Sequence, residues 1–76
     1  MRFDYSKLLG RITEIYGNQG DFAIAMRLSE RTMSLKLNNI RPWKDNEIKK
    51  AMKLLKLPEN KVHLYFFKEE VQETEL

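Results

Sequence analysis

Residues that start or stop helices divide this chain into short segments, and this limits the folds open to it. Gly17 can end a helix, Ser29 can cap one, and Pro42 and Pro58 interrupt regular structure. Between these positions, apolar residues recur at helical spacing. The pattern predicts five short helices, at about 5–16, 19–26, 29–37, 44–55 and 59–66, which together form a compact all-α domain.

The apolar side of each segment indicates the core. On the first segment we expect the inward residues to be Tyr5, Leu8, Leu9, Ile12, Ile15 and Tyr16. The next three segments add Phe22, Ala23, Met26, Met33, Leu37, Ile48, Ala51, Met52 and Leu55. Gly10 either weakens the first helix or allows another helix to approach it closely.

The length of 76 residues allows one domain with one small core. We expect residues 1–68 to form it, and the acidic segment 69–76 to fray. The chain has no cysteine, so we expect neither a disulfide framework nor a thiolate zinc site. The N-terminus does not resemble a signal peptide, and no apolar run approaches the length of a membrane span. These features predict a cytoplasmic protein with no membrane contact.

Charge is distributed unevenly along the chain. Residues 27–56 contain nine basic side chains and three acidic ones, whereas residues 69–76 contain four glutamates and no base. A basic stretch of this kind attracts polyanions, and nucleic acid is the usual one. The alternative is a solvated, lysine-rich surface, and for Lys49, Lys50, Lys53 and Lys56 we favour that interpretation.

The segment from Gln19 to Asn38 has the pattern of two short helices that cross steeply at a turn. Such a crossing requires a small residue near the closest approach, and Ala23 meets that requirement. Ser29 then caps the second of the two helices, so that its first turn points outward. In DNA-binding proteins of this kind, that turn supplies the base contacts.

This segment resembles the helix-turn-helix of Cro and CI-type phage repressors, also called the xenobiotic-response-element class. The resemblance covers residues 5 to 57, and the string LSERTMSLKLNN (28–39) resembles small regulators of temperate phages and prophages of Gram-positive bacteria. Two positions depart from the pattern. Arg27 stands where glycine is usual, and a left-handed backbone would cost it about 1 kcal/mol. Lys36 stands where a core aliphatic is usual, so either Leu37 takes the core role or the helix is rotated.

The resemblance implies a repressor-like domain that binds double-stranded DNA, and it implies roles for individual residues. Base contacts would come from Glu30, Arg31, Ser34 and Leu35. Phosphate contacts would come from Gln19, Asn38, Asn39, Arg41 and Lys44. The alternative for Arg31 is an ion pair with Glu30 or Asp21.

The aromatic run near the end of the chain is too wide for one helix face to bury. We expect Tyr65, Phe66, Phe67 and Val71 to form a homodimer contact, made in solution or only on DNA. The alternative is that this run folds back onto the first helix. Trp43 is expected to pack against the domain, and His63 to be a surface or packing residue.

No arrangement of residues supports catalysis, because the single histidine leaves no nucleophile and base pair, and no phosphate loop is present. We therefore expect no enzyme, no cofactor and no metal. The sequence predicts a Cro-like repressor that recognises operator DNA in the major groove. The alternative is a protein-interaction module on the same fold, such as an antitoxin or antirepressor. DNA binding would weaken steeply with salt, whereas an aromatic protein interface would not.

Overall fold

The computed structural model describes residues 2–70 and contains five α-helices. They are α1 (Ser6–Tyr16), α2 (Gln19–Met26), α3 (Glu30–Leu37), α4 (Asp45–Leu54) and α5 (Val62–Phe66). A 3-10 helix, η1 (Glu59–Lys61), leads directly into α5. The predicted all-α fold of five short helices is confirmed. The fifth predicted helix differs in its first turn, which takes the tighter 3-10 form. No helix of the described chain is both long and apolar enough to cross a membrane.

Local side-chain and backbone signals set the helix ends. Gly17 ends α1 with a positive φ of 88°, a conformation that costs glycine little. The side chain of Asn18 accepts a hydrogen bond from the backbone N–H of Asp21 (2.8 Å) and thereby caps α2. The carboxylate of Glu47 accepts one from the backbone N–H of Lys44 (2.9 Å) at the start of α4.

All five α-helices contribute buried side chains to one core. Its largest fully buried side chains are Phe22, Phe66, Leu8, Ile12, Met33 and Leu55. Ile15 is an exception to the prediction, since it is exposed at the last turn of α1. The buried row of α1 follows Leu8 and Ile12 to Tyr16, whose ring lies 5.3 Å from that of Phe22. Of the two residues expected to face inward at the end of α1, only Tyr16 therefore does so.

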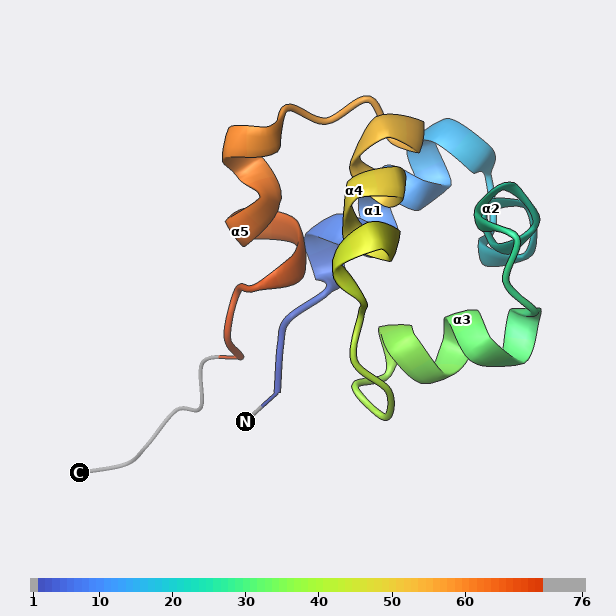
Figure 1. Ribbon diagram of the computed structural model, residues 1–76, viewed down its shortest axis with the longest axis horizontal. Helices are drawn as coiled ribbons and strands as arrows, with labels where there is room; N and C mark the ends of the chain where they lie inside the picture. Colours follow the sequence, from blue (N-terminus) through green and yellow to red (C-terminus); the bar gives the residue numbers. More distant parts are fainter. Residues whose placement is uncertain (1, 71–76) are drawn as a thin grey trace.

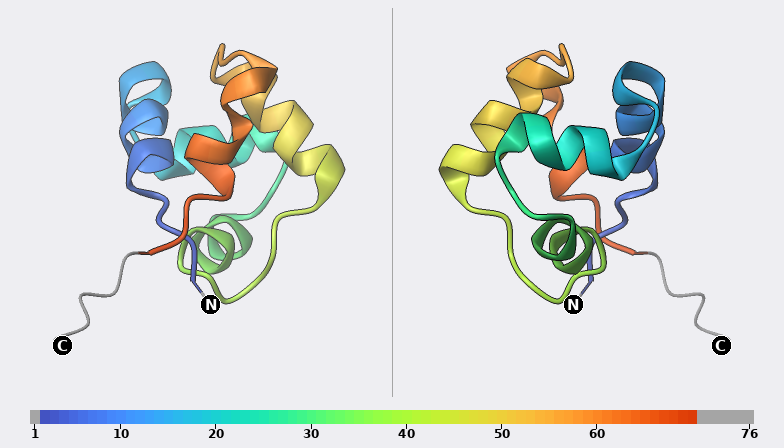
Figure 2. Two further views of the ribbon diagram at one scale, coloured as in Figure 1. Left: turned by 90° about the vertical axis from the view of Figure 1, so that its left-hand side faces the viewer. Right: turned by 90° about the vertical axis from the view of Figure 1, so that its right-hand side faces the viewer.

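Helix α3 lies at one edge of the molecule, and the other four α-helices all lie on one side of it (Figures 1 and 2). The loop after α3 returns along the same edge to reach α4. This arrangement leaves the outer side of α3 open to solvent, and it places the loop beside the two ends of the described chain.

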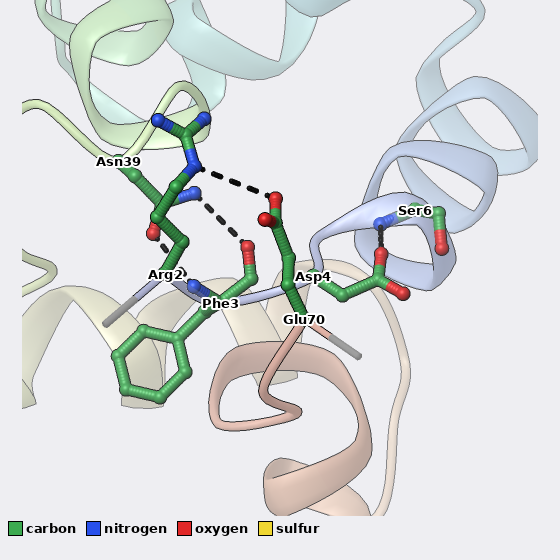
Figure 3. A network of polar contacts seen from close by, with 6 residues as sticks. All are labelled: Arg2, Phe3, Asp4, Ser6, Asn39 and Glu70. Atoms are coloured by element: carbon green, nitrogen blue, oxygen red, sulfur yellow. Dashed lines mark hydrogen bonds and ion pairs between the residues drawn. The ribbon is translucent and has the colours of Figure 1, made fainter. Parts of the chain in front are cut away.

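The two chain ends lie together at that edge. Phe3 and Glu69 form an antiparallel β-bridge, and the backbone N–H of Glu70 donates to the carbonyl of Arg2 (3.0 Å). Figure 3 shows the side chain of Glu70 paired with that of Arg2 (3.5 Å). Glu69 and Glu70, the first residues of the segment expected to fray, thus pair with the N-terminal segment, and the fraying itself stays a prediction. The remainder of the predicted tail, 71–76, lies outside the described residues.

Candidate interaction surface at the second and third helices

The turn between α2 and α3 is made by Arg27, Leu28 and Ser29. Arg27 adopts the left-handed conformation, with φ 61° and ψ 39°, as its place in the pattern predicted. Its N–H donates to the carbonyl of Ile24 (3.0 Å), and that of Leu28 donates to the carbonyl of Ala23 (2.9 Å). These bonds satisfy the last carbonyls of α2 and turn the chain sharply, while Ala23 is almost completely buried.

Ser29 caps α3 as predicted. Its hydroxyl oxygen accepts a hydrogen bond from the backbone N–H of Thr32 (3.1 Å) and contacts the hydroxyl of Thr32 (2.9 Å). The first turn of α3 thereby points outward, with Glu30 and Arg31 exposed. Within residues 2–70, Arg31 forms no ion pair with Glu30 or Asp21. The Arg31 guanidinium is therefore available to a partner.

The carboxylate of Glu30 turns back toward the start of α2. A Cβ atom built on Gly20 would lie only 2.7 Å from one of its oxygens, so the absence of a side chain at Gly20 creates this space. Asp21 adds a second acid in the first turn of α2. The predicted phosphate contact, Gln19, is exposed but stands beside these two carboxylates. Negative charge already complements the positive end of the α2 dipole there, which disfavours a phosphate.

The two asparagines after α3 make hydrogen bonds within the protein. The side-chain amide of Asn38 donates to the carbonyl of Ser34 (2.7 Å) and lies 3.2 Å from its hydroxyl. Asn39 has a positive φ of 63°, and its amide oxygen and nitrogen both pair with the backbone of Phe3, at 2.9 Å each (Figure 3). These bonds join the N-terminal segment to this loop and compete with the phosphate contact expected at Asn39, which stays a prediction.

Lys36 is buried, with a relative exposure of 3%. Its ammonium group lies 2.8 Å from the Glu47 carboxylate and donates to the carbonyl of Pro42 (3.0 Å). Leu37 is buried as well, so the two adjacent residues share the core role that the sequence left open. Leu35 is only half-buried. Of Leu35 and Lys36, Leu35 is therefore the residue that a partner can reach.

The ion pair also affects Glu47. Burial by itself raises the pKa of Glu47, but hydrogen bonds from Lys36 and from the Lys44 backbone, together with the charges of both lysines, outweigh it. The pKa of this carboxyl therefore lies below its ordinary value of 4.5. Sequence inspection missed the pair because a lysine on a basic stretch predicts a solvated side chain. The signal that could have indicated a buried Lys36 was its position in the pattern, where an aliphatic core residue is usual.

The predicted dimer contact is divided between the core and the surface. Phe66 is only 1% exposed and packs edge-on against Trp43, with ring centroids 5.1 Å apart. It is therefore corrected from an interface residue to a core residue, as the alternative of folding back implied. Phe67 is 48% exposed, with its ring edge-on to that of Phe3, and Tyr65 is half-buried. Val71 lies outside the described residues, and the homodimer stays a prediction.

Two exposed apolar side chains near α3 were not anticipated from the sequence. Ile24 on α2 is 74% exposed, and Ile40 in the loop after α3 is 67% exposed. Arg41 and Lys44, both predicted phosphate contacts, are exposed nearby. The surface around α2 and α3 is thus a mixture of exposed cations, two carboxylates at the start of α2, and isolated apolar side chains.

These features define a small all-α protein whose second and third helices meet at a tight, capped turn beside an exposed surface. The chain belongs to the family described as "Protein of unknown function (DUF739)", which matches residues 1–69. It is also similar to the solution structure of the modulator of repression (MOR) of the temperate bacteriophage TP901-1 from Lactococcus lactis. That chain is 56% identical, with 95% of this chain and 97% of that chain covered and a TM-score of 0.80. No curated protein matches the chain.

The expected relation to temperate phages is confirmed, because the similar structure comes from one. The Cro and CI class, and DNA binding itself, stay predictions from the sequence.

Proposed function

We propose that the chain is a modulator of repression that acts by binding another protein, a phage repressor. The observation that carries this proposal is the 56% identity to a phage modulator of repression over 95% of the chain. Of the interpretations drawn from the sequence, the protein-interaction module of the antirepressor kind is therefore preferred to the Cro-like repressor.

The surface around α2 and α3 supports a protein partner in two ways. Asn39, predicted to hold a phosphate, uses both its amide oxygen and its amide nitrogen in bonds to the Phe3 backbone, and the Glu30 and Asp21 carboxylates lie at the start of α2. The exposed Ile24 and Ile40 offer apolar contacts, which a protein interface uses and a phosphate backbone does not.

DNA binding is the second candidate function. It is favoured by the Ser29 cap, which directs the first turn of α3 outward, and by Arg31, which is exposed there without an ion pair among residues 2–70. An arginine at this position of a recognition helix is suited to bidentate contact with guanine. The two candidates make opposite predictions for a simple binding experiment.

The test of the first candidate is calorimetric titration of the chain with the purified repressor of bacteriophage TP901-1. We expect a saturable complex, weakened by Ile24→Gln, which removes a 74% exposed side chain and should leave the fold intact. Ile15→Gln is the matched control, because Ile15 is the partly exposed isoleucine of α1. If no complex forms with the repressor, this proposed function fails.

The test of the second candidate is fluorescence anisotropy with operator and random duplex DNA over a series of salt concentrations. If the chain reads DNA, binding falls steeply with salt, and Arg31→Ala costs about 1–3 kcal/mol on the operator but much less on random DNA. Selective operator binding by the chain alone, without repressor, would replace the first candidate with the second.

A further inference from the structure

A groove of about 810 Å³ lies between α4 and the segment formed by η1 and α5. Residues 55–58 link these two parts of the chain, which run beside the groove from opposite sides (Figures 1 and 2). The apolar part of its lining consists of Ile48, Met52, Leu57, Val62 and Phe67. Phe67 is 48% exposed, whereas Ile48 and Met52, at 7% and 4%, form the buried floor of the groove. Leu57 and Val62 are partly exposed.

The α4 wall of the groove is basic. Lys49 and Lys53 are exposed, line the groove and stand one helical turn apart. Neither forms an ion pair within the described part of the chain. Lys50 also lines the groove, but its ammonium group lies 3.4 Å from the carbonyl of Met26. Asp45 and Glu59 complete the charged lining, at the first residues of α4 and η1.

A second hollow, of about 290 Å³, shares Ile48 and Phe67 with the groove. It is also lined by Ile40 and Pro42. The apolar surface therefore continues from the groove, past Phe67, to the 67% exposed Ile40 in the loop after α3. A partner seated in the groove could extend its contacts toward α3.

We infer that the groove between α4 and α5 binds an amphipathic helix of the partner protein. The apolar stripe of that helix lies on the apolar lining, and two acidic side chains one turn apart face Lys49 and Lys53. This is the helix-in-groove mode of recognition. The lysines of α4 select a partner helix that has acidic residues beside its apolar stripe. Nucleic acid fits less well, because the apolar half of the lining offers no donors to phosphate oxygens and Asp45 and Glu59 would repel them. The inference deepens the proposed function, for which the repressor supplies the helix.

The first experiment does not require the repressor. A synthetic amphipathic peptide of about four helical turns, with a leucine stripe flanked on one side by glutamates one turn apart, is titrated into the isotope-labelled chain and followed by NMR. We expect saturable shift changes at Lys49, Lys53 and Val62. A peptide of the same composition in scrambled order is the control. Equal binding of the scrambled peptide, or shifts confined to α2 and α3, would overturn the inference.

The same titration separates other occupants of the groove. If the signals of Lys49 and Val62 move with protein concentration before peptide is added, a second copy of the chain occupies the groove. If random duplex DNA shifts the signals of Lys49 and Val62 and the peptide does not, the lysines of the groove bind a polyanion. Either result overturns the inference of a partner helix.

The second experiment uses the repressor and the double variant Lys49→Glu with Lys53→Glu. Two reversed surface charges should weaken the complex about tenfold, and high salt should reduce the difference. The control is Lys7→Glu with Lys61→Glu, two exposed lysines that do not line the groove. Unchanged affinity of the groove variant overturns the inference while leaving the proposed function intact. A repressor that does not bind the wild-type chain removes the proposed function, and the peptide titration then decides on the groove alone.

Discussion

The ammonium group of Lys36 lies 2.8 Å from the carboxylate of Glu47, and the two side chains are only 4% and 14% exposed. The pair joins α3 to the first turn of α4, and the same ammonium group holds the carbonyl of Pro42 in the connecting loop. The Trp43 ring lies over it, with its centroid 6.0 Å away. A charge therefore occupies a core position of α3, and the path of the following loop depends on it.

Removing one member of this pair should destabilise the protein more than removing the charge of both. Lys36→Met leaves the largely buried carboxylate of Glu47 without its partner, so we expect a loss of about 3 kcal/mol in the free energy of unfolding. Lys36→Met with Glu47→Gln should recover most of this loss, since glutamine still accepts from the Lys44 N–H. Urea denaturation measures both. Lys49→Met, at an exposed lysine, is the control, and a double variant as unstable as the single one would contradict the expectation.

Stability should fall in acid partly through Glu47. Because the pKa of Glu47 is lowered in the folded protein, its contribution is fully present above the unfolded value near 4.5 and is lost as pH falls through the folded pKa. Glu47→Gln should therefore be less stable than wild type at neutral pH but show a shallower loss below pH 4.5. Thermal melts over a pH series measure this. Glu59→Gln, at an exposed position, should keep the wild-type slope, and parallel curves for Glu47→Gln and wild type would refute the assignment.

Asn39 combines a left-handed backbone with two hydrogen bonds to Phe3, and two substitutions separate these effects. Asn39→Gly keeps the backbone conformation but loses the bonds, for which we expect a loss of about 1–3 kcal/mol. Asn39→Ala should cost about 1 kcal/mol more, because alanine disfavours φ 63°. Chemical denaturation gives the energies, and hydrogen exchange at the Phe3 amide reports the lost contact. Equal stabilities of the two variants would show that the backbone conformation contributes nothing.

The two glycines at the middle and end of α1 should respond oppositely to alanine. A Cβ on Gly10 would meet nothing within 4 Å, so Gly10→Ala should stabilise the protein by roughly 0.5–1 kcal/mol through helix propensity. Gly10 therefore weakens the helix and does not serve a close approach. Gly17 has a φ of 88°, and Gly17→Ala should cost about 1 kcal/mol or more. Thermal denaturation of both variants checks the signs, and a destabilising Gly10→Ala would be inconsistent with open space there.

The sequence by itself determined the features that depend on near neighbours in the chain. The bounds of α2 and the cap at Ser29 were predictable, because caps and helical spacing act within one or two turns. The left-handed turn at Arg27 was expected only from the resemblance to the helix-turn-helix pattern. The exposure of Glu30 and Arg31 on the first turn of α3 followed from the same local signals.

Tertiary structure alone decided the features that depend on distant segments. The amide of Asn39 is used by Phe3, which lies 36 positions earlier, and Glu47 makes Lys36 a core residue. Of two adjacent phenylalanines, Phe66 is buried against Trp43 and Phe67 is left at the surface. The physical reason is common to all three. A polar or aromatic side chain can be buried or exposed at similar local cost, and the outcome depends on the partner that the fold brings to it.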